Sequence, residues 1–338
     1  MIGEGHQVYF TVRVREFVTE LLAHEKFDMT SFGSNYHSAV GKLWGLLLFT
    51  FKLWRVALKY KPDIYLSHSS MYAAITAFLM RRPHISFEDT FNKEQVLLYK
   101  PFTKVILTGN YQHPLKSEKV LRYAGYHELA YLHPKRFLPD QTILQELGVE
   151  EGEKYVIFRF VSWNASHDFG HTGISYENKI KAVNEFTKLA RVFISSEKQL
   201  PDELVKFKIK IAPHRMHDAI AFASLVFGES ATMITEGAML GVPGIYLDNT
   251  GRYYTKELQT KYRLVFNCSE SLSDQQLAIL KGMELLQQPN IKKEWQQKRE
   301  KMLADKIDVT AFLVWFIENY PVSASIMKEN PDYQYNFI

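Results

Sequence analysis

The sequence predicts an α/β protein with two domains, each built on a parallel sheet. Short apolar, strand-like runs alternate with longer helix-like runs in two successive blocks, which is typical of parallel sheets covered by helices on both faces. The chain has 338 residues, more than one hydrophobic core usually covers. A stretch at 139–152 combines a loop, a short helix and a turn. We place the domain boundary there, with domains at 1–150 and 151–306 and a final segment at 307–338.

In the first block, the expected strands are apolar runs bounded by polar or turn-forming residues, and the expected helices have apolar residues at helical spacing. The strands are predicted at 7–14, 64–67, 85–87, 105–108 and 119–123. The helices are predicted at 15–24, 39–60 and 71–80.

The second block repeats this alternation after a short helix at 142–147. Its strands are predicted at 155–161, 192–195, 208–211, 225–227 and 244–248. Its helices are predicted at 177–190, 218–224, 233–240, 274–286, 292–303 and 308–319. Proline cannot continue a helix, so Pro321 ends the last one and residues 321–338 are expected to form a tail.

The segment 225–248 carries the clearest functional signal. Small residues join a buried strand to a short helix, and Gly241 stands where a helix end favours a positive φ. The free N–H groups of such a helix start attract anions. Glu236, expected in the first turn, could then accept hydrogen bonds from ribose hydroxyls beside a diphosphate. The alternative is a plain β-α-β unit in which Ser230 or Thr232 caps the helix.

Polar side chains also follow the predicted strands of the first block. His68, Glu88 and His127 stand after three of these strands. In open α/β sheets, ligands bind outside the carboxyl ends of the strands. Imidazoles and carboxylates there suit general acid–base work or the binding of hydroxyls and phosphates.

The strand ends of the second block carry a longer set of polar residues. Arg159 lies inside an apolar strand, so its charge requires a partner, which is either a buried carboxylate or a ligand phosphate. Asp218 is expected to cap a helix, and Glu229 is either a loop cap or a ligand contact. The remaining candidates at these strand ends are Ser162, Asn164, His167, Ser195, Ser196, Glu197, Ser230, Ala231 and Thr232.

Composition limits the class of protein. Hydrophobic residues make up 46% and charged residues 23%, and the net charge of +4 does not by itself argue for nucleic acid. The one cysteine, Cys268, excludes a disulfide framework or a cysteine metal site within one chain. No His, Cys and carboxylate set has metal-ligand spacing. The chain opens without an apolar signal-peptide core, and we expect a cytoplasmic protein.

The stretch 42–59 is apolar and aromatic, with Lys52, Arg55 and Lys59 at helical spacing. Such a helix could lie on an anionic membrane surface, which would place the protein at the inner face of the membrane. The alternative is a helix that covers the sheet and turns its cations to water.

Four segments of the sequence resemble the domain of unknown function 354 family of archaea and bacteria. They are 126–134, 159–168, 192–197 and 228–232. The similarity runs from about Gly5 to about Phe316. That family is related to the GT-B superfamily, whose members have two Rossmann-like domains with parallel sheets facing across a cleft. Relatives include the non-hydrolysing UDP-N-acetylglucosamine 2-epimerases and the glycosyltransferase that completes lipid II.

The resemblance implies roles for residues of the second domain. In the epimerases, a loop with two glycines and a following Glu hold the diphosphate and ribose. Here residues 229–232 occupy the loop, Ala231 and Thr232 replace the glycines, and Glu236 takes the ribose position. In the glycosyltransferases the loop after the preceding strand recognises the base, which implies a base contact at 212–216 that includes Pro213.

The resemblance also implies differences in the first domain. Ser70 stands where the epimerases carry a catalytic Asp, whereas Glu88 matches an epimerase glutamate. Relatives have a strand, a Gly/His-rich loop and a helix before the part that matches Gly5 onward, so we expect the first domain to lack its first strand and helix. The helix at 308–319 is expected to cross back to the first domain.

Together these observations predict a glycosyltransferase that uses a nucleotide-sugar donor, UDP-linked by resemblance, in cell-surface polysaccharide or glycoconjugate synthesis. The base is His68 or Glu88, with His127 as a third candidate, and no metal is expected to be required. The acceptor would be a sugar or a lipid-linked group, and the protein a monomer or homodimer. The alternatives are a nucleotide-sugar epimerase or hydrolase, and a binding protein of the same fold without catalysis.

Overall fold

A computed structural model describes residues 1–13, 17–33, 38–112, 114–161, 173–196 and 199–338. The chain divides into two compact units, which are described separately. Unit 1 comprises Met1–His127 and Val309–Phe337, and unit 2 comprises Glu128–Asp308 with Ile338. The division therefore falls before the predicted boundary at 150. Residues after His127 belong to unit 2 because they bond to it, as Arg215 does to Glu146 at 3.0 Å.

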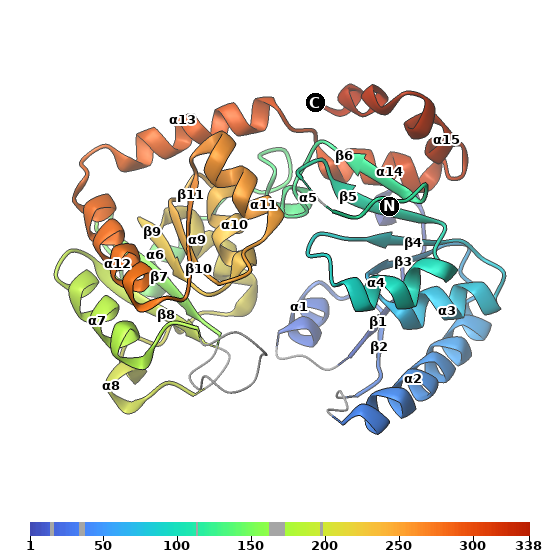
Figure 1. Ribbon diagram of the computed structural model, residues 1–338, viewed down its shortest axis with the longest axis horizontal. Coiled ribbons are helices and arrows are strands. Elements are labelled where there is room, and N and C mark those ends of the chain that lie inside the picture. Colours follow the sequence, from blue (N-terminus) through green and yellow to red (C-terminus); the bar gives the residue numbers. More distant parts are fainter. Residues whose placement is uncertain (14–16, 34–37, 113, 162–172, 197–198) are drawn as a thin grey trace. The chain divides into compact units, whose positions relative to one another are not determined.

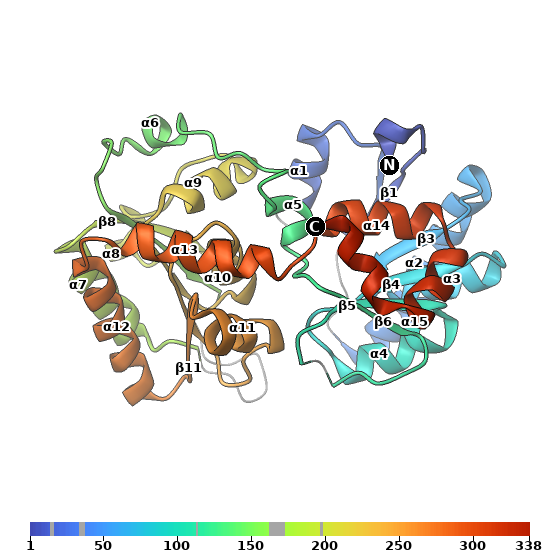
Figure 2. The same cartoon turned by 90° about the horizontal axis from the view of Figure 1, so that it is seen from above.

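Unit 1 contains a four-stranded parallel sheet in the order β3-β4-β5-β6. Helices α2, α3 and α4 lie on one face of this sheet and α14 and α15 on the other (Figures 1 and 2). Ile106 packs with Ala74 and Tyr99 on the first face, and Tyr123 packs with Phe312 on the second. The elements are β3 (Tyr65–His68), β4 (His84–Phe87), β5 (Val105–Gly109), β6 (Val120–Tyr123), α2 (Ala39–Tyr60), α3 (Met71–Leu79), α4 (Lys93–Tyr99), α14 (Val309–Glu318) and α15 (Val322–Glu329).

Two further strands of unit 1, β1 (Phe10–Val12) and β2 (Met29–Ser31), pair in parallel as a separate sheet, joined by α1 (Val18–His24). Tyr9, which precedes β1, stacks on Tyr60 at the end of α2, with ring centroids 3.9 Å apart. Arg13, which follows β1, lies over the ring of Tyr72 in α3. Among the described residues β1 and β3 belong to different sheets, and the expectation that the first domain lacks its first strand and helix stays a prediction.

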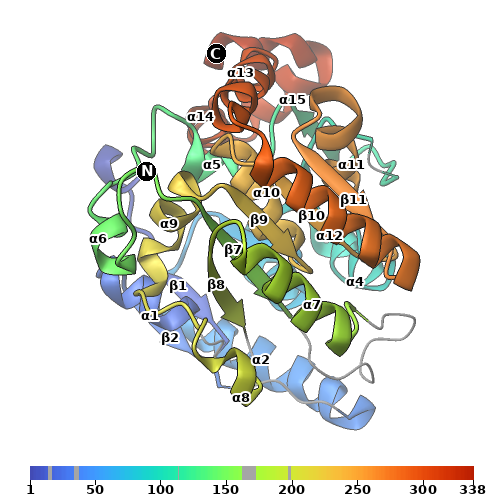
Figure 3. The ribbon, with the colours of Figure 1, turned by 90° about the vertical axis from the view of Figure 1, so that its left-hand side faces the viewer.

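Unit 2 contains a five-stranded parallel sheet in the order β11-β10-β9-β7-β8. On one face, Phe186 of α7 packs against Phe158 and Phe227, and Figure 3 shows α7 and α12 side by side. On the other face, Tyr155 donates to the carbonyl of Ala219 in α9, and α10 lies beside it. The elements are β7 (Tyr155–Phe160), β8 (Arg191–Ser196), β9 (Leu225–Gly228), β10 (Gly244–Leu247), β11 (Val265–Cys268), α7 (Tyr176–Thr187), α9 (Met216–Phe222), α10 (Ala231–Met239), α12 (Leu272–Gln287) and α13 (Ile291–Ala304).

Short helices complete both units. They are η1 (Ile2–Glu4), η2 (Lys100–Phe102), α5 (Leu129–Leu132), α6 (Ile143–Leu147), α8 (Asp202–Val205), η3 (Pro213–Arg215), α11 (Tyr253–Glu257), η4 (Leu258–Tyr262) and η5 (Pro331–Phe337). The α/β class with parallel sheets in two Rossmann-like domains is thus confirmed.

Two element predictions were wrong. Residues 208–211 do not form a strand, because only Lys208 makes a bridge, to Ile194, before the chain turns into η3 at Pro213. The predicted tail is helical: α15 and η5 follow Pro321, and Gln334 accepts a hydrogen bond of 2.5 Å from the backbone of Ala124. Proline ended α14 as expected but also began the next helix, where its missing N–H costs nothing.

Candidate functional site

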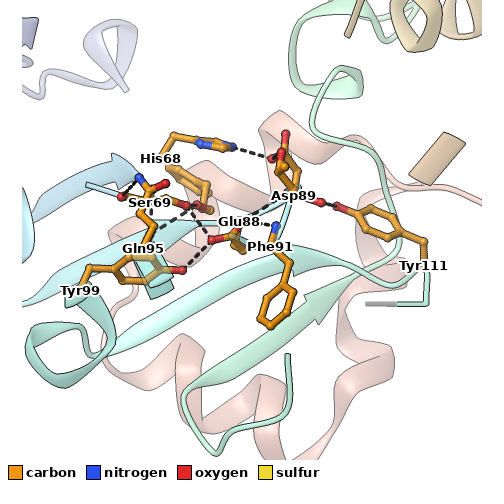
Figure 4. A network of polar contacts seen from close by, with 11 residues as sticks. His68, Ser69, Glu88, Asp89, Phe91, Gln95, Tyr99 and Tyr111 are labelled. Atoms are coloured by element: carbon orange, nitrogen blue, oxygen red, sulfur yellow. Dashed lines mark hydrogen bonds and ion pairs between the residues drawn. The ribbon is translucent and has the colours of Figure 1, made fainter. Parts of the chain in front are cut away.

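In unit 1, three ionisable side chains meet at the carboxyl end of the sheet. His68 ends β3, Asp89 follows β4 and His127 follows β6. The Nε2 of His68 lies 3.2 Å from an oxygen of Asp89, and Figure 4 shows the two side chains turned toward each other. The rings of His68 and His127 are 5.5 Å apart, edge to face. Parallel neighbouring strands end at the same edge, so the fold itself brings these groups together.

The charges of this cluster shift its protonation equilibria. Burial opposes protonation of His68, but the hydrogen bond and charge of Asp89 outweigh it and raise the pKa of His68. Burial likewise opposes ionisation of Asp89, yet His68 and Thr90 lower the pKa of that carboxyl. Burial and the neighbouring His68 lower the pKa of His127. The cluster therefore contains a carboxylate, an imidazole that readily takes a proton, and a second imidazole that stays neutral.

Glu88 is buried beneath this cluster and shapes the turn after β4. One of its oxygens accepts from Ser69 at 2.7 Å and Tyr99 at 2.8 Å. The other accepts from the backbone amides of Thr90 at 3.2 Å and Phe91 at 2.8 Å (Figure 4). The Glu88 side chain thus holds the loop that carries Asp89, and its role as a base stays a prediction.

Ser70, which the resemblance aligns with an epimerase Asp, is used by the fold. Its hydroxyl accepts from the amide of Ala73 at 3.3 Å and caps the start of α3. A serine hydroxyl does not titrate in the range of a carboxyl, so Ser70 cannot take over acid–base work there.

In unit 2, Glu236 is the centre of a second cluster. Its Oε1 accepts from the hydroxyl of Tyr131 and lies 3.0 Å from Nε2 of His217. The ring of Tyr131 lies 5.3 Å from that of His217. Because α10 begins at Ala231, Glu236 lies in the second helical turn and not in the first as predicted. The carboxylate is only 7% exposed and oriented by two donors.

The predicted phosphate-binding loop of unit 2 has partners within the protein. Glu229 accepts from the amides of Val161 at 2.8 Å and Ile174 at 2.7 Å, and lies 2.9 Å from Nζ of Lys179. Arg159 is buried and donates to Ser195 at 2.9 Å. These contacts identify Glu229 as a residue that holds the backbone at Val161 and Ile174, while its contact with nucleotide stays a prediction.

The other predicted residues of unit 2 are distributed as follows. Ser230 caps α10 by accepting from the amide of Met233 at 3.4 Å. Ala231 is buried, Thr232 is exposed and Ser196 is half-buried. Ser162, Asn164, His167 and Glu197 lie outside the described residues.

Asp218 was wrongly expected to cap a helix. Helix α9 starts before it, at Met216. Its side chain instead accepts from the amide of Asp140 at 2.8 Å and from Arg215 at 2.7 Å.

Three residues of the two clusters are not among the predicted site residues: Asp89, Tyr131 and His217. Asp89 had a visible signal, since it follows a predicted strand directly after Glu88. Tyr131 and His217 had none, because their contact with Glu236 depends on the packing of α5, α9 and α10. In the part of the chain that the structure describes, no three His, Cys, Asp or Glu side chains could hold a metal ion.

Comparisons with known proteins identify the fold. No family model and no curated protein matches the sequence. Solved structures do match: S. aureus MnaA in complex with UDP has 13% identity and a TM-score of 0.59 over 83% of this chain and 80% of that one. A UDP-GlcNAc 2-epimerase from Neisseria meningitidis bound to UDP-GlcNAc has 14% identity and a TM-score of 0.58, with 82% of each chain covered. The fold is of the GT-B type.

A glycosyltransferase shares this GT-B fold equally well. The spinosyn forosaminyltransferase SpnP has 10% identity and a TM-score of 0.57 over 90% of this chain and 89% of that one. At such identities the likeness establishes the fold and leaves the reaction to the residues of the site. The membership in the domain of unknown function 354 family stays a prediction.

Proposed function

We propose that this GT-B protein is a glycosyltransferase that uses a nucleotide sugar, with His68 as its general base. The observation that carries the proposal is the His68–Asp89 pair. Because Nε2 of His68 faces the carboxylate, the proton of the neutral imidazole resides on Nε2 and the lone pair on Nδ1. A carboxylate that orients an imidazole in this way favours one tautomer and stabilises the imidazolium formed when a proton is taken up.

In the proposed reaction, Nδ1 of His68 removes the proton of an acceptor hydroxyl as the oxygen attacks the anomeric carbon of the donor sugar. The bond from that carbon to the diphosphate breaks, and the nucleoside diphosphate leaves with the electron pair. Asp89 stabilises the resulting imidazolium. The predicted donors to the diphosphate are Arg159, Ser230 and Thr232, and Glu236 is the predicted ribose contact.

Support for a nucleotide-sugar donor comes from two directions. Solved neighbours were determined with UDP or UDP-GlcNAc, and another is a sugar transferase. Within this chain, Glu236 is a nearly buried carboxylate oriented by Tyr131 and His217. A carboxylate fixed in this way can accept paired ribose hydroxyls with little loss of side-chain entropy. We propose UDP as the nucleotide and a sugar or lipid-linked acceptor, in a reaction that needs no metal.

The second candidate is a nucleotide-sugar epimerase or hydrolase, which the epimerase neighbours favour. Ser70 argues against it, since by resemblance it stands at the position of the epimerase acid and its hydroxyl caps α3. The third candidate is a protein that binds nucleotide without turnover.

The three candidate functions predict different products in a single assay. The protein is incubated with UDP-, GDP- and CDP-sugars, with EDTA, and with or without a panel of sugar and lipid-linked acceptors. The products are separated by chromatography that resolves epimers and identified by mass spectrometry. A transferase forms the nucleoside diphosphate and a glycosylated acceptor only when both substrates are present. Turnover of the donor alone would indicate an epimerase or hydrolase. Binding without any product would indicate the third candidate and contradict the proposal.

A further inference from the structure

The helix α2 exposes a stripe of large apolar side chains. Five of them, Leu43, Trp44, Leu47, Phe51 and Leu58, are between 46% and 63% exposed. At 100° per residue, these five positions fall within about 100° of the helix circumference. Single exposed apolar residues are ordinary on protein surfaces, but a continuous stripe over four helical turns marks an interaction surface.

Packing within unit 1 does not require this stripe. The opposite side of α2 is buried: Phe49 is 3%, Leu53 7% and Ala57 2% exposed. Phe49 and Leu53 pack with Ala73 of α3, and Ala57 packs with Tyr65 and Ala77. The helix is therefore apolar on both sides, one of which stabilises the unit while the other faces outward.

The charges of α2 have a single sign. The 22 residues from Ala39 to Tyr60 include Lys42, Lys52, Arg55 and Lys59 and no Asp or Glu. Arg55 and Lys59 are exposed and continue, at intervals of four, the row of Leu43, Leu47 and Phe51. Cations on the flank of an apolar stripe can contact phosphate groups while the apolar side chains enter the acyl layer.

The neighbouring helix α3 extends the same surface. The packing of Ala57 on Ala77 brings the C-terminal ends of α2 and α3 together, and Figure 1 shows the helices side by side. Phe78 and Leu79, at the end of α3, are 61% and 55% exposed. Three exposed cations, Lys61, Arg81 and Arg82, follow these helix ends, and Arg82 pairs with Asp63 at 3.4 Å.

We propose that the outward face of α2, with the end of α3, binds the surface of an anionic lipid bilayer. Helix α2 would lie in the plane of the membrane, with Trp44, Leu47 and Phe51 among the lipid chains and Arg55 and Lys59 at the phosphates. A bilayer fits better than a protein partner because the cations of α2 have no acidic residue of that helix to offset them. None of the helices that the structure describes is long and apolar enough to cross a bilayer. This proposal is independent of the reaction catalysed.

The test is flotation of the full chain with vesicles of phosphatidylcholine alone or with 30% phosphatidylglycerol. We expect at least tenfold stronger binding to the anionic vesicles, reduced as salt is raised from 0.1 to 1 M. The double variant Leu47→Gln/Phe51→Gln should weaken binding at least tenfold. Arg55→Gln/Lys59→Gln should weaken it roughly fivefold for each cation lost, on anionic vesicles alone.

A matched control changes two equally exposed leucines of unit 2, Leu277 and Leu280, to Gln. This control should bind lipid as the unmodified chain does, and circular dichroism should show that all variants are folded. Equal binding to both vesicle types, no binding to either, or unchanged binding of Leu47→Gln/Phe51→Gln would overturn the proposal. A lipid-free dimer that Leu47→Gln/Phe51→Gln dissociates, with no vesicle binding, would assign the face to a second copy of the chain instead.

Discussion

The two units contain the same β-α-β arrangement, and comparing these regions shows where they differ in chemistry. Residues 65–90 form β3, α3 and β4, and residues 225–250 form β9, α10 and β10, with each element beginning at the same position. Ser70 and Ser230 each accept from the amide three residues later and cap the helix. The two regions thus share the same order and spacing of elements and the same helix cap, although few of their residues are identical.

The turn after the second strand is also shared. Glu88 accepts from the amides of Thr90 and Phe91, and Asp248 accepts from those of Thr250 and Gly251. Phe91 and Gly251 both have left-handed backbone, with φ of 59° and 61°. An acidic side chain at this position therefore stabilises a turn in both units. This comparison indicates that the carboxylate of Glu88 serves the fold and supports His68 as the base.

The two regions differ in the residues at the ends of their strands. Unit 1 has His68 and Asp89, whereas the equivalent residues of unit 2 are Gly228 and Asn249. Gly228 has a φ of 147°, and a Cβ there would come within 2.1 Å of the carbonyl oxygen of Arg159. At these positions unit 1 thus has groups that can exchange protons. Unit 2 has a close approach of the backbones of Gly228 and Arg159, together with the fixed carboxylate of Glu236. We infer a division of labour in which unit 1 transfers the proton and unit 2 binds the nucleotide.

The largest expected effect comes from His68. Replacing it by Gln keeps a polar side chain but removes the basic nitrogen, so turnover should fall by about 10²- to 10⁴-fold, the usual contribution of a general base. Nucleotide affinity should not change. Steady-state kinetics measures the effect, and His24→Gln, at an exposed position of α1, is the control. A His68→Gln variant that retains full turnover would remove the proposed role of unit 1.

Acid should destabilise unit 1 more than unit 2, because buried His84 stands where unit 2 has Gly244. Burial lowers the pKa of His84 from 6.5 to about 4. Between these values only the unfolded chain binds the proton, so stability is present above pH 6.5 and lost as the pH falls toward 4. The loss is between about 3 and 4 kcal/mol, at about 1.4 kcal/mol per pKa unit over the shift from 6.5 to about 4.

Hydrogen exchange followed by mass spectrometry can separate the two units in this experiment. Between pH 6.5 and 4.5, after correction for the intrinsic rate, peptides of β3 and β4 should lose more protection than those of β9 and β10. The variant His84→Asn should lessen the pH dependence in unit 1 alone. Equal loss in both units would show that His84 does not control the acid stability. The raised pKa of His68 acts in the opposite sense, since it adds stability below its ordinary pKa.

Asp89→Asn should show how Asp89 acts on His68, both on its pKa and on the imidazolium formed during the reaction. The amide lacks the charge that raises the pKa of His68, so the acidic limb of the kcat profile should move to lower pH. The maximal rate should fall roughly tenfold or more, because the imidazolium is less stabilised. Asn249→Asp places a carboxylate at the equivalent position of unit 2 and should leave this limb in place. An unshifted limb in Asp89→Asn would show that Asp89 does not act on the base.

The smallest effect concerns the residue after each helix. Arg81 and Gly241 both have left-handed backbone, with φ of 55° and 74°. Gly241→Ala should cost about 1 to 2 kcal/mol of unfolding free energy, because a Cβ disfavours this conformation. Arg81 already has a Cβ, so Arg81→Ala adds none and should cost much less unfolding free energy. Urea denaturation compares the two, and equal losses would contradict the argument.

The sequence predicts elements well where the pattern is local. Helix α2 was predicted at its observed bounds, because apolar residues recur over its whole length. Strand β11 was missed because its four residues include polar Asn267 and a single cysteine. Residues 208–211 alternate as a strand does, but only one bridge to β8 forms. Pairing partners, which decide such cases, are not contained in a local pattern.

For the candidate site, too, the sequence predicts residues with a local signal but not the contacts that depend on the folded structure. His68 and Glu88 were predicted because each follows a strand-like run. The distinction between them was not predicted, since it depends on which group Asp89 approaches and on how many donors surround Glu88. The contacts of Glu236 with Tyr131 and His217 depend on helix packing and carry no local signal.

The most direct test of the division of labour is calorimetric titration of UDP and UDP-sugars into three forms of the protein. They are the unmodified chain, His68→Gln and Glu236→Ala. We expect His68→Gln to bind as tightly as the unmodified chain. We expect Glu236→Ala to bind at least tenfold more weakly, about 1.4 kcal/mol, the scale of one hydrogen bond to a charged group. Unchanged affinity in Glu236→Ala, or a folded protein that binds none of these nucleotides, would contradict the proposed division of labour.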